Sequence, residues 1–537
     1  MGLFETNQAP RVPRAKFDLS HDRKLTMNMG TLIPVLNKEV LPGDVWRCSP
    51  TVFLRFLALL APIMHKVNVK LEVFFCAYRL VWPNFPDFVS GGESGTAAPV
   101  FPTFNTTQCN VTNTTILQDG SLLDYLGFPT YPQSGTYNAA YNGNTFSILH
   151  PRVYTLIYDT WYRNQNVETT VIGTTFGADG PQNAGDYPFI FSLRSRQWER
   201  DYFTSCQPST QRGTQVVIPI SSTITSPSGN TNIPIVRVSG GAANTVSHAI
   251  GSKAADGSLM DQTSLAGVYL DPNGSLIASN TSLTVNALRA SITLQTYKER
   301  MQRGGGRYIE YLWNVFGVAS DDARLQRPEL IYTLREPVTV SEVLTTSTGT
   351  GTGQTPPGTL AGAAMSIGSG GSGVYAAKEH GCIMALMSVI PRSAYQNGIG
   401  PEFWRQVNTD FYVPDFAHLG EQTVIQQNVY YDMTNAAQAS NGGVVFGYQS
   451  RFAEYKYAND QVSGQFKSTL GFWHLGRQFN STSVPALNLA FCQCVPRKDI
   501  FAVTTDVDHI VVDIYWNISV LRPMPYFGTP STLNAVS

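Results

Sequence analysis

A short run of glycines has the spacing of a nucleotide-binding loop. Residues 368–373, GSGGSG, match the pattern G-x-G-x-x-G, in which glycines let the backbone approach a pyrophosphate at the start of a helix. That chemistry needs a strand before the run, a helix after it and an acidic residue about 20 positions further on. Here the glycines lie within a Gly/Ser/Thr-rich segment, 345–373, which predicts a mobile surface loop. We therefore interpret the run as loop, and no cofactor is expected.

Side chains that could bind a metal ion or catalyse a reaction are scattered. The chain has seven cysteines without a CxxC pair, and Cys492 and Cys494 have no histidine nearby to complete a zinc site. The run LAFCQCV predicts a strand with both thiols on one face, and all seven are expected to be free thiols in a reducing compartment. Asp506 and Asp508 could hold a cation through oxygen ligands, but a solvated turn is the preferred interpretation. No metal site and no catalytic group of residues is predicted, so the chain is not expected to be an enzyme.

Arginines beside aromatic residues are the feature best suited to binding. Segment 194–213 reads RSRQWERDYFTSCQPSTQRG, and further basic residues occur in the polar segment 1–24. Arginine can stack on unpaired bases and contact phosphates, whereas Arg, Trp and Tyr also form hot spots at protein–protein contacts. Contact with DNA and contact with another subunit both remain open for these residues: Arg11, Arg14, Lys16, Arg194, Arg196, Trp198, Arg200 and Arg212.

The stretch from Phe403 to Arg497 is crowded with Trp, Tyr and Phe and carries only scattered charges. Aromatic side chains bury large areas at low entropic cost and are enriched at protein–protein contacts. The stretch therefore predicts a surface that packs against other subunits. The candidate interface residues are Trp404, Tyr412, Phe416, Tyr448, Phe452, Tyr455 and Trp473.

The composition favours a protein covered by copies of itself. Charged residues make up 14% of the chain, against roughly 25% in ordinary soluble domains, and burying unpaired charge is costly. With 37 basic and 38 acidic residues the net charge is −1, so any contact with nucleic acid must be local. No secretory signal is visible in the first 20 residues, and the longest apolar run, 52–64, is too short to span a bilayer. A β-rich extracellular protein would share this composition.

Alternating apolar and polar residues predict mainly antiparallel strands. In 67–80, Asn68, Lys70 and Glu72 alternate with apolar residues, which predicts a strand with one buried face. Residues 382–390 are nearly all apolar and predict a strand buried on both faces. Further strands are predicted at 25–36, 45–56 and 510–521.

Three helices are predicted to interrupt this pattern as packing elements within long loops. They span 151–165, 287–303 with Asn286 as the N-terminal cap, and 307–316, which carries apolar residues at helical spacing.

The chain divides into four predicted parts. Residues 1–24 predict an extended N-terminal arm that lies on another molecule or surface, and 25–213 the first part of a β barrel. Residues 214–286 contain five charged side chains and one aromatic, too few to form a core alone, so they predict a surface insertion. Residues 287–537 predict a helical insertion followed by the rest of the barrel. Strands early and late in the chain, separated by long loops with insertions, are typical of a jelly roll, in which strands distant in the sequence pair.

Long segments of the chain resemble the major capsid proteins of microviruses, small single-stranded DNA bacteriophages, and of their gokushovirus-like members in particular. The resemblance extends through most of the chain in the family's order. It is carried by LIPVLNKEVLPGD (32–44), RLVWPNF (79–85), RVYTLIYDTWYRNQN (152–166), RQWERDYFTS (196–205), RYIEYLWNVFGVASDDARLQRPE (307–329), SVIPRSAYQNGI (388–399), FAHLGEQ (416–422) and FGYQSRFAEYKY (446–457).

The resemblance implies a mainly β fold, an eight-stranded antiparallel jelly-roll barrel with long insertions that contain a few helices. It also implies self-assembly into a T=1 icosahedral shell around a circular single-stranded DNA genome, inside a bacterial host's cytoplasm. Implied partners are a small basic DNA-binding phage protein, scaffolding and pilot proteins, and a receptor on the host cell, without membrane insertion. The insertion would form a protrusion at the three-fold axes that meets this receptor, with candidate contacts at Thr225, Asn230, Asn232, Tyr269 and Asn273.

Two other classes of protein remain as alternatives. A glycan-binding or glycan-cleaving β protein would need a signal peptide or paired carboxylates in a cleft, and neither is apparent. A phage receptor-binding fibre would be trimeric and would show repeats, which the sequence lacks.

Overall fold

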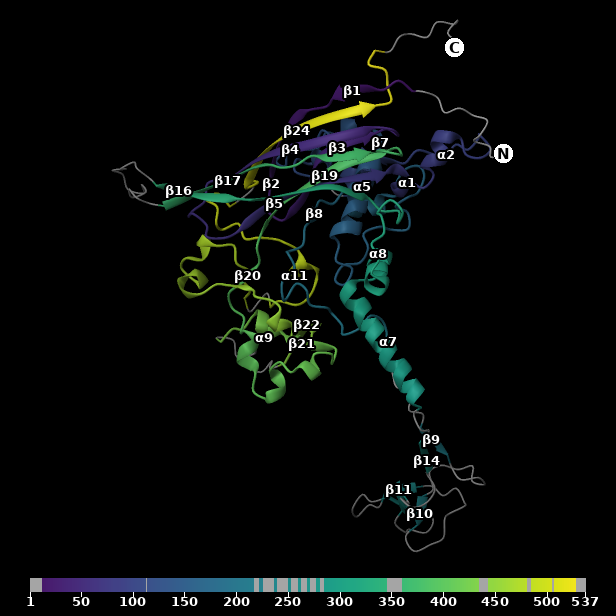
Figure 1. The fold of residues 1–537 in the computed structure, drawn as a ribbon, viewed down its shortest axis with the longest axis vertical. Coiled ribbons are helices and arrows are strands. Elements are labelled where there is room, and N and C mark those ends of the chain that lie inside the picture. The colour runs from purple at the N-terminus through teal and green to yellow at the C-terminus, as the bar shows by residue number, and fades with distance from the viewer. Residues whose placement is uncertain are drawn as a thin grey trace. The chain divides into compact units, whose positions relative to one another are not determined.

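The computed structural model describes residues 12–112, 114–216, 284–344, 360–433, 443–480, 484–504 and 507–527, and six short strands between 217 and 283. The chain forms two units. The first combines Met1–Thr210 with Gln302–Ser537, and the second is Gln211–Met301. The first unit is mostly antiparallel sheet with some helices (Figure 1).

The larger sheet of the first unit has seven strands. Its central pair brings an early strand and a late strand of the chain side by side. Strand β24 runs antiparallel to β4, from Ile510 opposite Phe56 to Leu521 opposite Val45. Strand order is β1-β24-β4-β17-β16, with β2 also on β24 and β18 also on β4. The strands are β1 (Ala15–Asp18), β2 (His21–Met27), β4 (Val45–Phe56), β16 (Thr339–Leu344), β17 (Leu360–Ser369), β18 (Gly373–Ala376) and β24 (Ile510–Arg522).

The smaller sheet has five antiparallel strands in the order β15-β5-β19-β3-β8. It also pairs segments that are distant in the sequence, because β19 lies between β5 and β3. The strands are β3 (Thr31–Val40), β5 (Val67–Ala77), β8 (Arg194–Ser195), β15 (Glu329–Pro337) and β19 (Gly381–Pro391).

One hydrophobic core unites the inward faces of both sheets. On β24, Ile514 and Trp516 lie in this core, and the residue between them, Tyr515, is exposed. On β5, Val69 and Leu71 join the same core while polar residues alternate with them, as predicted from the sequence. Alternation with a period of two thus decides which side of each strand is buried.

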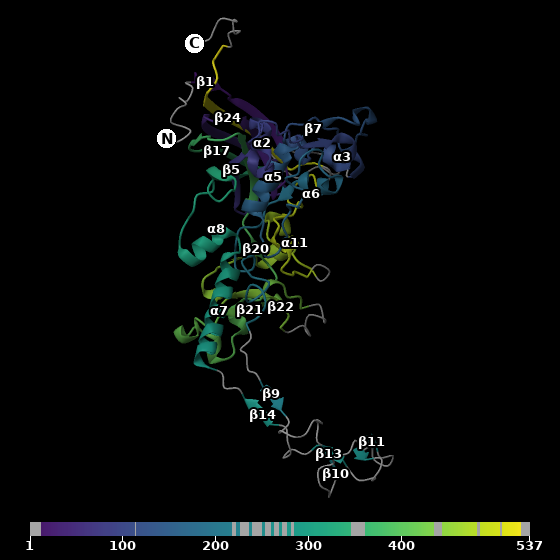
Figure 2. The same ribbon diagram turned by 90° about the vertical axis from the view of Figure 1, so that its right-hand side faces the viewer.

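Strand β19 is buried on both faces, which confirms its prediction. Ile383, Ala385 and Met387 face the core between the sheets. Met384 and Leu386 face a second core, which is formed with the helices that gather beside the sheets in Figure 2. A strand covered on both sides has few positions at which a polar side chain is favoured, so its sequence is nearly all apolar.

The helices are short apart from α7. Predicted helix 151–165 is observed as α5 followed by a π-helical turn, η3 (Tyr158–Tyr162). The Thr284 hydroxyl, rather than Asn286, accepts the backbone N–H of Ala287 at the start of α7. The helices are α1 (Tyr78–Val81), α2 (Phe85–Ser90), α3 (Thr106–Thr112), α4 (Leu122–Tyr125), α5 (Leu149–Ile157), α6 (Tyr187–Ile190), α7 (Val285–Gly304), α8 (Tyr308–Tyr311), α9 (Gln426–Val429) and α11 (Leu489–Cys492).

The remaining strands form small two-stranded sheets. In the first unit these are β6 (Thr103–Asn105) with β7 (Thr145–Ser147), β20 (Ala394–Tyr395) with β23 (Asp460–Gln461), and β21 (Glu421–Ile425) with β22 (Val445–Ser450). In the second unit they are β9 (Ser222–Thr225) with β14 (Ile277–Asn280), β10 (Val236–Val238) with β13 (Val268–Leu270), and β11 (Ile250–Ser252) with β12 (Leu259–Asp261).

The structure corrects the predicted strand at 25–36. A turn at Gly30 separates β2 from β3. Glycine is required at this turn, because its φ is +81° and a Cβ there would lie 1.8 Å from the carbonyl oxygen of Cys494. The predicted arm is also partly sheet. Its residues from Ala15 onward form β1 and β2, which pair with β24 of the same chain. The local sequence could not reveal this pairing, because β24 lies near the other end of the chain.

The predicted loop 345–373 is wrong from Leu360 onward. Residues 360–369 form β17, between β16 and β4, and the glycine run crosses the turn from β17 to β18 without a helix after it. Small residues are needed there by close packing, since a Cβ on Gly362 would lie 2.5 Å from the carbonyl oxygen of Ala61. Composition alone could not separate this requirement from flexibility. Residues 345–359 lie outside the described part.

The seven cysteines are all free and buried. The strand predicted around Cys492 and Cys494 is wrong, because Cys492 ends helix α11. Burial raises the pKa of Cys48 and of Cys109 to about 12 each. Since the thiolate is the reactive form, these thiols are unreactive in the folded protein.

We expect a thiol reagent at about pH 8 to leave the folded protein essentially unmodified. Unfolding in guanidinium should then expose all seven thiols. A colorimetric thiol titration before and after denaturation measures both values. Rapid modification of one or more thiols in the folded protein would contradict the burial described here.

Candidate functional site

The polar face of β5 is matched by the arginine-rich segment that follows β8. The Arg196 guanidinium pairs with Glu72 at 2.7 Å, and both side chains are largely buried, with exposures of 16% and 15%. The same guanidinium lies 5.0 Å from the centre of the Tyr162 ring, whose hydroxyl donates to Glu72. Burial, and then the negative charge of Glu72, raise the pKa of Tyr162 well above its usual value, so the hydroxyl keeps its proton.

A second ion pair forms two positions along the same strand face. Lys70 approaches Glu199 at 2.7 Å, and Arg335 of β15 approaches the same carboxylate at 3.0 Å. Burial alone would raise the pKa of Glu199, but the hydrogen bond and charge of Lys70 and the charge of Arg335 hold it below its usual value. Glu199 is therefore an ionised link between the arginine-rich segment and two strands of the sheet.

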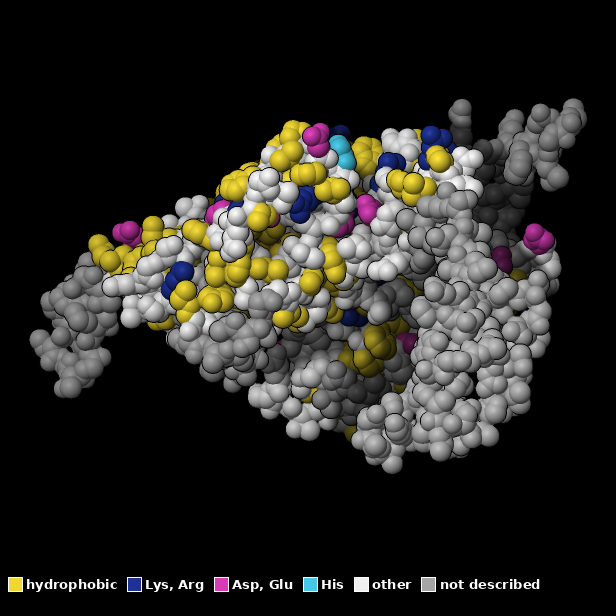
Figure 3. All heavy atoms as spheres, turned by 90° about the horizontal axis from the view of Figure 1, so that it is seen from below, with side chains coloured by type: hydrophobic (Ala, Val, Ile, Leu, Met, Phe, Trp, Pro, Cys, Tyr) yellow, Lys and Arg dark blue, Asp and Glu magenta, His cyan; other side chains and the backbone are white. Residues whose placement is uncertain are grey.

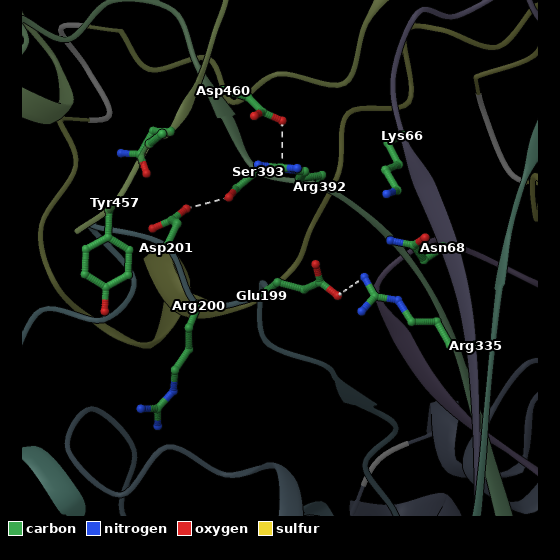
Figure 4. Close-up of a pocket in the computed structure, with 12 residues that line it drawn as sticks. Lys66, Asn68, Glu199, Arg200, Asp201, Arg335, Arg392, Ser393, Tyr457 and Asp460 are labelled. Atoms are coloured by element: carbon green, nitrogen blue, oxygen red, sulfur yellow. Dashed lines mark hydrogen bonds and ion pairs between the residues drawn. The ribbon is translucent and has the colours of Figure 1, made fainter. Parts of the chain in front are cut away.

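A polar cavity of about 210 Å³ opens beside this pair (Figure 4). Asp201, on its far side from Arg335, accepts hydrogen bonds from the Tyr395 hydroxyl and the Thr204 backbone N–H, both at 2.7 Å. Arg392 pairs with Asp460 at 2.9 Å. The residues that border the cavity include Lys66, Asn68, Glu199, Arg335, Arg392 and Asp460.

The structure separates the candidate residues for DNA or subunit contact. Arg196 and Trp198 lie inside the protomer, where Arg196 pairs with Glu72, so this structure leaves neither side chain free for the two contacts considered, with DNA or with another subunit. The guanidinium of Arg194 lies 5.4 Å from the Tyr158 ring and donates to a backbone carbonyl at 2.7 Å. The exposed candidates are Arg14, Lys16, Arg200 and Arg212, and Arg11 lies outside the described residues.

The aromatic stretch 403–497 is part core and part surface. Phe446 and Phe491 are buried with Tyr202 and Phe203 in a third hydrophobic core. Arg477 lies 3.9 Å from the centre of the Phe491 ring and donates to the Phe491 carbonyl at 2.6 Å. Aromatic density in this stretch therefore serves folding as well as the surface.

The other part of the stretch forms an exposed arginine–aromatic surface, defined here by Trp404, Arg405, Phe411, Tyr412 and Tyr455. The Arg405 guanidinium lies 4.5 Å from the Tyr455 ring centre and 5.7 Å from that of Phe411. All four aromatic side chains are exposed. Planar side chains held by an arginine are ordered before a partner binds, which lowers the entropic cost of association.

The other candidate interface residues are less accessible. Phe452 is only 3% exposed, packed against Tyr412 at a ring distance of 5.2 Å, so its predicted contact with another subunit is corrected to an internal one. Phe416, Tyr448 and Trp473 are half-buried.

A second exposed aromatic surface was missed by sequence reasoning. It lies on helix α8 and the π-helical turn η5 (Leu312–Phe316), where none of the residues is buried and Trp313 is 62% exposed. We define the α8 surface by Tyr308, Trp313 and Phe316, all exposed. The apolar periodicity was visible in the sequence, but periodicity does not reveal whether a partner within the protomer covers the face.

Hydrogen bonds of Arg307 and Glu310 hold the α8 surface in place on the first unit. Arg307 donates to the carbonyls of Asp159 and Arg163 at 2.7 and 3.1 Å. Glu310 accepts from the Arg307 backbone N–H at 2.9 Å and from the Gln165 amide at 2.6 Å. The exposed aromatic residues are therefore held at a fixed place on the first unit.

Figure 3 shows one face of the molecule, where hydrophobic side chains are spread among backbone and uncharged side chains and few charged side chains lie between them. No group of three or more metal-binding side chains occurs among the described residues. Asp508 is bonded instead to the Thr26 hydroxyl and the Asn28 amide, at 2.7 and 2.6 Å, while Asp506 lies outside the described part. Within the described ranges, no helix is long and apolar enough to cross a membrane.

The candidate receptor contacts fall on the second unit. Thr225 and Tyr269 belong to strands β9 and β13. Asn230, Asn232 and Asn273 lie outside the described residues.

Comparison with known proteins supplies the context for these surfaces. A family described as capsid protein (F protein) matches residues 5–532. The chain is 30% identical to capsid protein VP1 of Chlamydia phage 1, over 97% of this chain and 96% of that protein. It is also 30% identical to capsid protein VP1 of Bdellovibrio phage phiMH2K, over 97% and 95%, and 26% identical to capsid protein VP1 of Spiroplasma virus 4, over 98% and 97%.

These matches confirm the resemblance to microvirus capsid proteins seen in the sequence. They also identify the protein as a structural component of a virion rather than an enzyme. The chain belongs to the phage capsid protein (F protein) family.

Proposed function

We propose that this chain is the major capsid protein of a microvirus and assembles into a T=1 icosahedral shell around a circular single-stranded DNA genome. The observation that carries the proposal is the pair of exposed aromatic surfaces, one ordered by Arg405 over its rings and the other anchored by the hydrogen bonds of Arg307, on a chain of the capsid family. Aromatic and arginine side chains with this exposure suit contacts between subunits.

The barrel proposed for this shell is an eight-stranded jelly roll. Support comes from two antiparallel sheets around one core, in which strands far apart in the sequence lie side by side. Pairing of β24 with β4, and of β19 with β5, gives the long-range connections typical of a jelly roll.

Assembly in the cytoplasm of a bacterial host is part of the same proposal, with scaffolding and pilot proteins as partners. The near-neutral charge of the chain, −1, means that a small basic phage protein would neutralise much of the packaged DNA. The exposed Arg14, Lys16, Arg200 and Arg212 are the remaining candidates for direct contact with DNA.

The experiment that tests the proposal is electron microscopy of the purified protein, expressed with its companion phage proteins and separated on a sucrose gradient. Uniform icosahedral particles are expected. A monomer or a trimer under every assembly condition would overturn the proposal in favour of a glycan-binding protein or a receptor-binding fibre.

Deleting residues 221–281 is expected to leave the first unit folded and to impair attachment to the host. The reason is that Gln211–Met301 forms a compact unit of its own, while the barrel strands belong to the first unit. Adsorption of particles to host cells is the measurement, with the melting temperature of the protomer as the control for folding. Unchanged adsorption would contradict a role of this unit in attachment.

A further inference from the structure

The polar face of β5 leaves one side chain without a protein partner. Glu72 meets Arg196, and Lys70 meets Glu199, each at 2.7 Å. Asn68, the next residue on that face, is only 4% exposed, yet its amide has no hydrogen-bond partner among the described residues. Because these amide atoms reach the adjoining cavity and are not fully buried, a ligand in that cavity can bond to them directly.

The Asn68 side chain is directed into the polar cavity (Figure 4). Cationic groups meet in the same space, because Lys66 directly precedes β5, Asn68 lies near the start of that strand, and Arg335 lies on β15 opposite Lys70. The backbone N–H of Arg392 donates to the carbonyl of Lys66 at 2.9 Å, which places these two residues together.

The carboxylates around the cavity already have donors of their own. Glu199 accepts from Lys70 and Arg335, and Asp460 accepts from Arg392. Asp201 accepts from the Tyr395 hydroxyl and from backbone N–H groups. The Lys66 ammonium has no ion pair within the described residues, and each arginine has N–H groups beyond those used in its pair.

We propose that this cavity binds a phosphate group through Lys66, Asn68, Arg335 and Arg392. A tetrahedral oxyanion accepts hydrogen bonds from all four side chains, and a guanidinium fork and an ammonium match its charge and geometry. A volume of about 210 Å³ has room for such a group. Arg200 is not part of this set, since its guanidinium is directed away from the others (Figure 4).

The phosphate could be free or could belong to a nucleotide, and titration separates these sources. Calorimetry of the full-length protomer, at constant ionic strength, compares inorganic phosphate, deoxyadenosine monophosphate, a short oligothymidylate and deoxyadenosine without phosphate. Tighter binding of the nucleotide or oligonucleotide than of inorganic phosphate assigns a nucleotide phosphate, and equal binding of inorganic phosphate assigns the free ion. No binding of any phosphate compound, or equal binding of deoxyadenosine, would overturn the proposal.

Asn68→Leu and Lys66→Met test the residues themselves. Each is expected to weaken phosphate binding by about tenfold or more, as for the loss of a hydrogen bond to a charged group. Lys38→Met, the same change at an exposed lysine of β3 outside the cavity, should leave the affinity unchanged. Asn68→Asp keeps the shape of the side chain and adds a repelling charge, so it should abolish binding even if Asn68→Leu folds poorly. Equal affinity of folded wild type, Lys66→Met and Asn68→Asp would overturn the site.

Discussion

Replacing Arg196 by methionine is expected to lower the free energy of unfolding of the protomer by about 3–5 kcal/mol, the cost of breaking a buried ion pair by removing one partner. The change leaves the Glu72 carboxylate largely buried with only the Tyr162 hydroxyl and no cation beside it. It also removes the guanidinium that lies over the Tyr162 ring. Denaturant unfolding followed by fluorescence measures the loss.

Two further variants make this prediction specific. Arg55→Met, at an exposed position of β4, should change the unfolding free energy by no more than about 0.5 kcal/mol. Combining Arg196→Met with Glu72→Gln should recover part of the stability, because the buried charge is then gone. An Arg196→Met protein as stable as wild type would show that the pair does not hold the arginine-rich segment to the sheet.

Trp404→Ala is expected to block particle formation while leaving a folded protomer. The Trp404 ring is exposed on the arginine–aromatic surface, so its removal costs the protomer little. Loss of an aromatic hot spot costs about 2 kcal/mol or more at each contact, and a closed shell repeats the contact many times. Trp313→Ala on the α8 surface should act in the same way. Sedimentation and electron microscopy of the assembly reaction give the readout.

The conservative variants Trp404→Phe and Trp313→Phe serve as matched controls and should retain more assembly than the alanine variants. Trp473→Ala, by contrast, should reduce both assembly and protomer stability, since the Trp473 ring is half-buried. Normal particles from Trp404→Ala and Trp473→Ala would refute the predicted role of the 403–497 stretch in assembly. Normal particles from Trp313→Ala would refute that of the α8 surface.

The strands were predictable where burial on one face imposed a period of two. The predicted strand 45–56 matches β4 at both ends, and 510–521 differs from β24 by one residue. Strand β17 was missed because a glycine within it, Gly362, is required by the close approach of the Ala61 backbone, which is distant in the sequence. The pattern of nearby residues in the sequence carries no information about a contact with such a distant residue.

The sequence by itself determined the strand-rich character of the chain, the buried face of each long strand and membership of the capsid family. The alternation of apolar and polar residues and the family motifs both lie in consecutive residues, so both can be recognised without a structure. Only the tertiary structure decided the role of each arginine and aromatic residue. Arg196 pairs with a carboxylate that lies 124 positions away, and Phe452 is buried whereas Tyr455 is exposed. Residue type sets what a side chain can bind, but packing of distant segments decides whether it meets its own chain, another subunit or an open cavity.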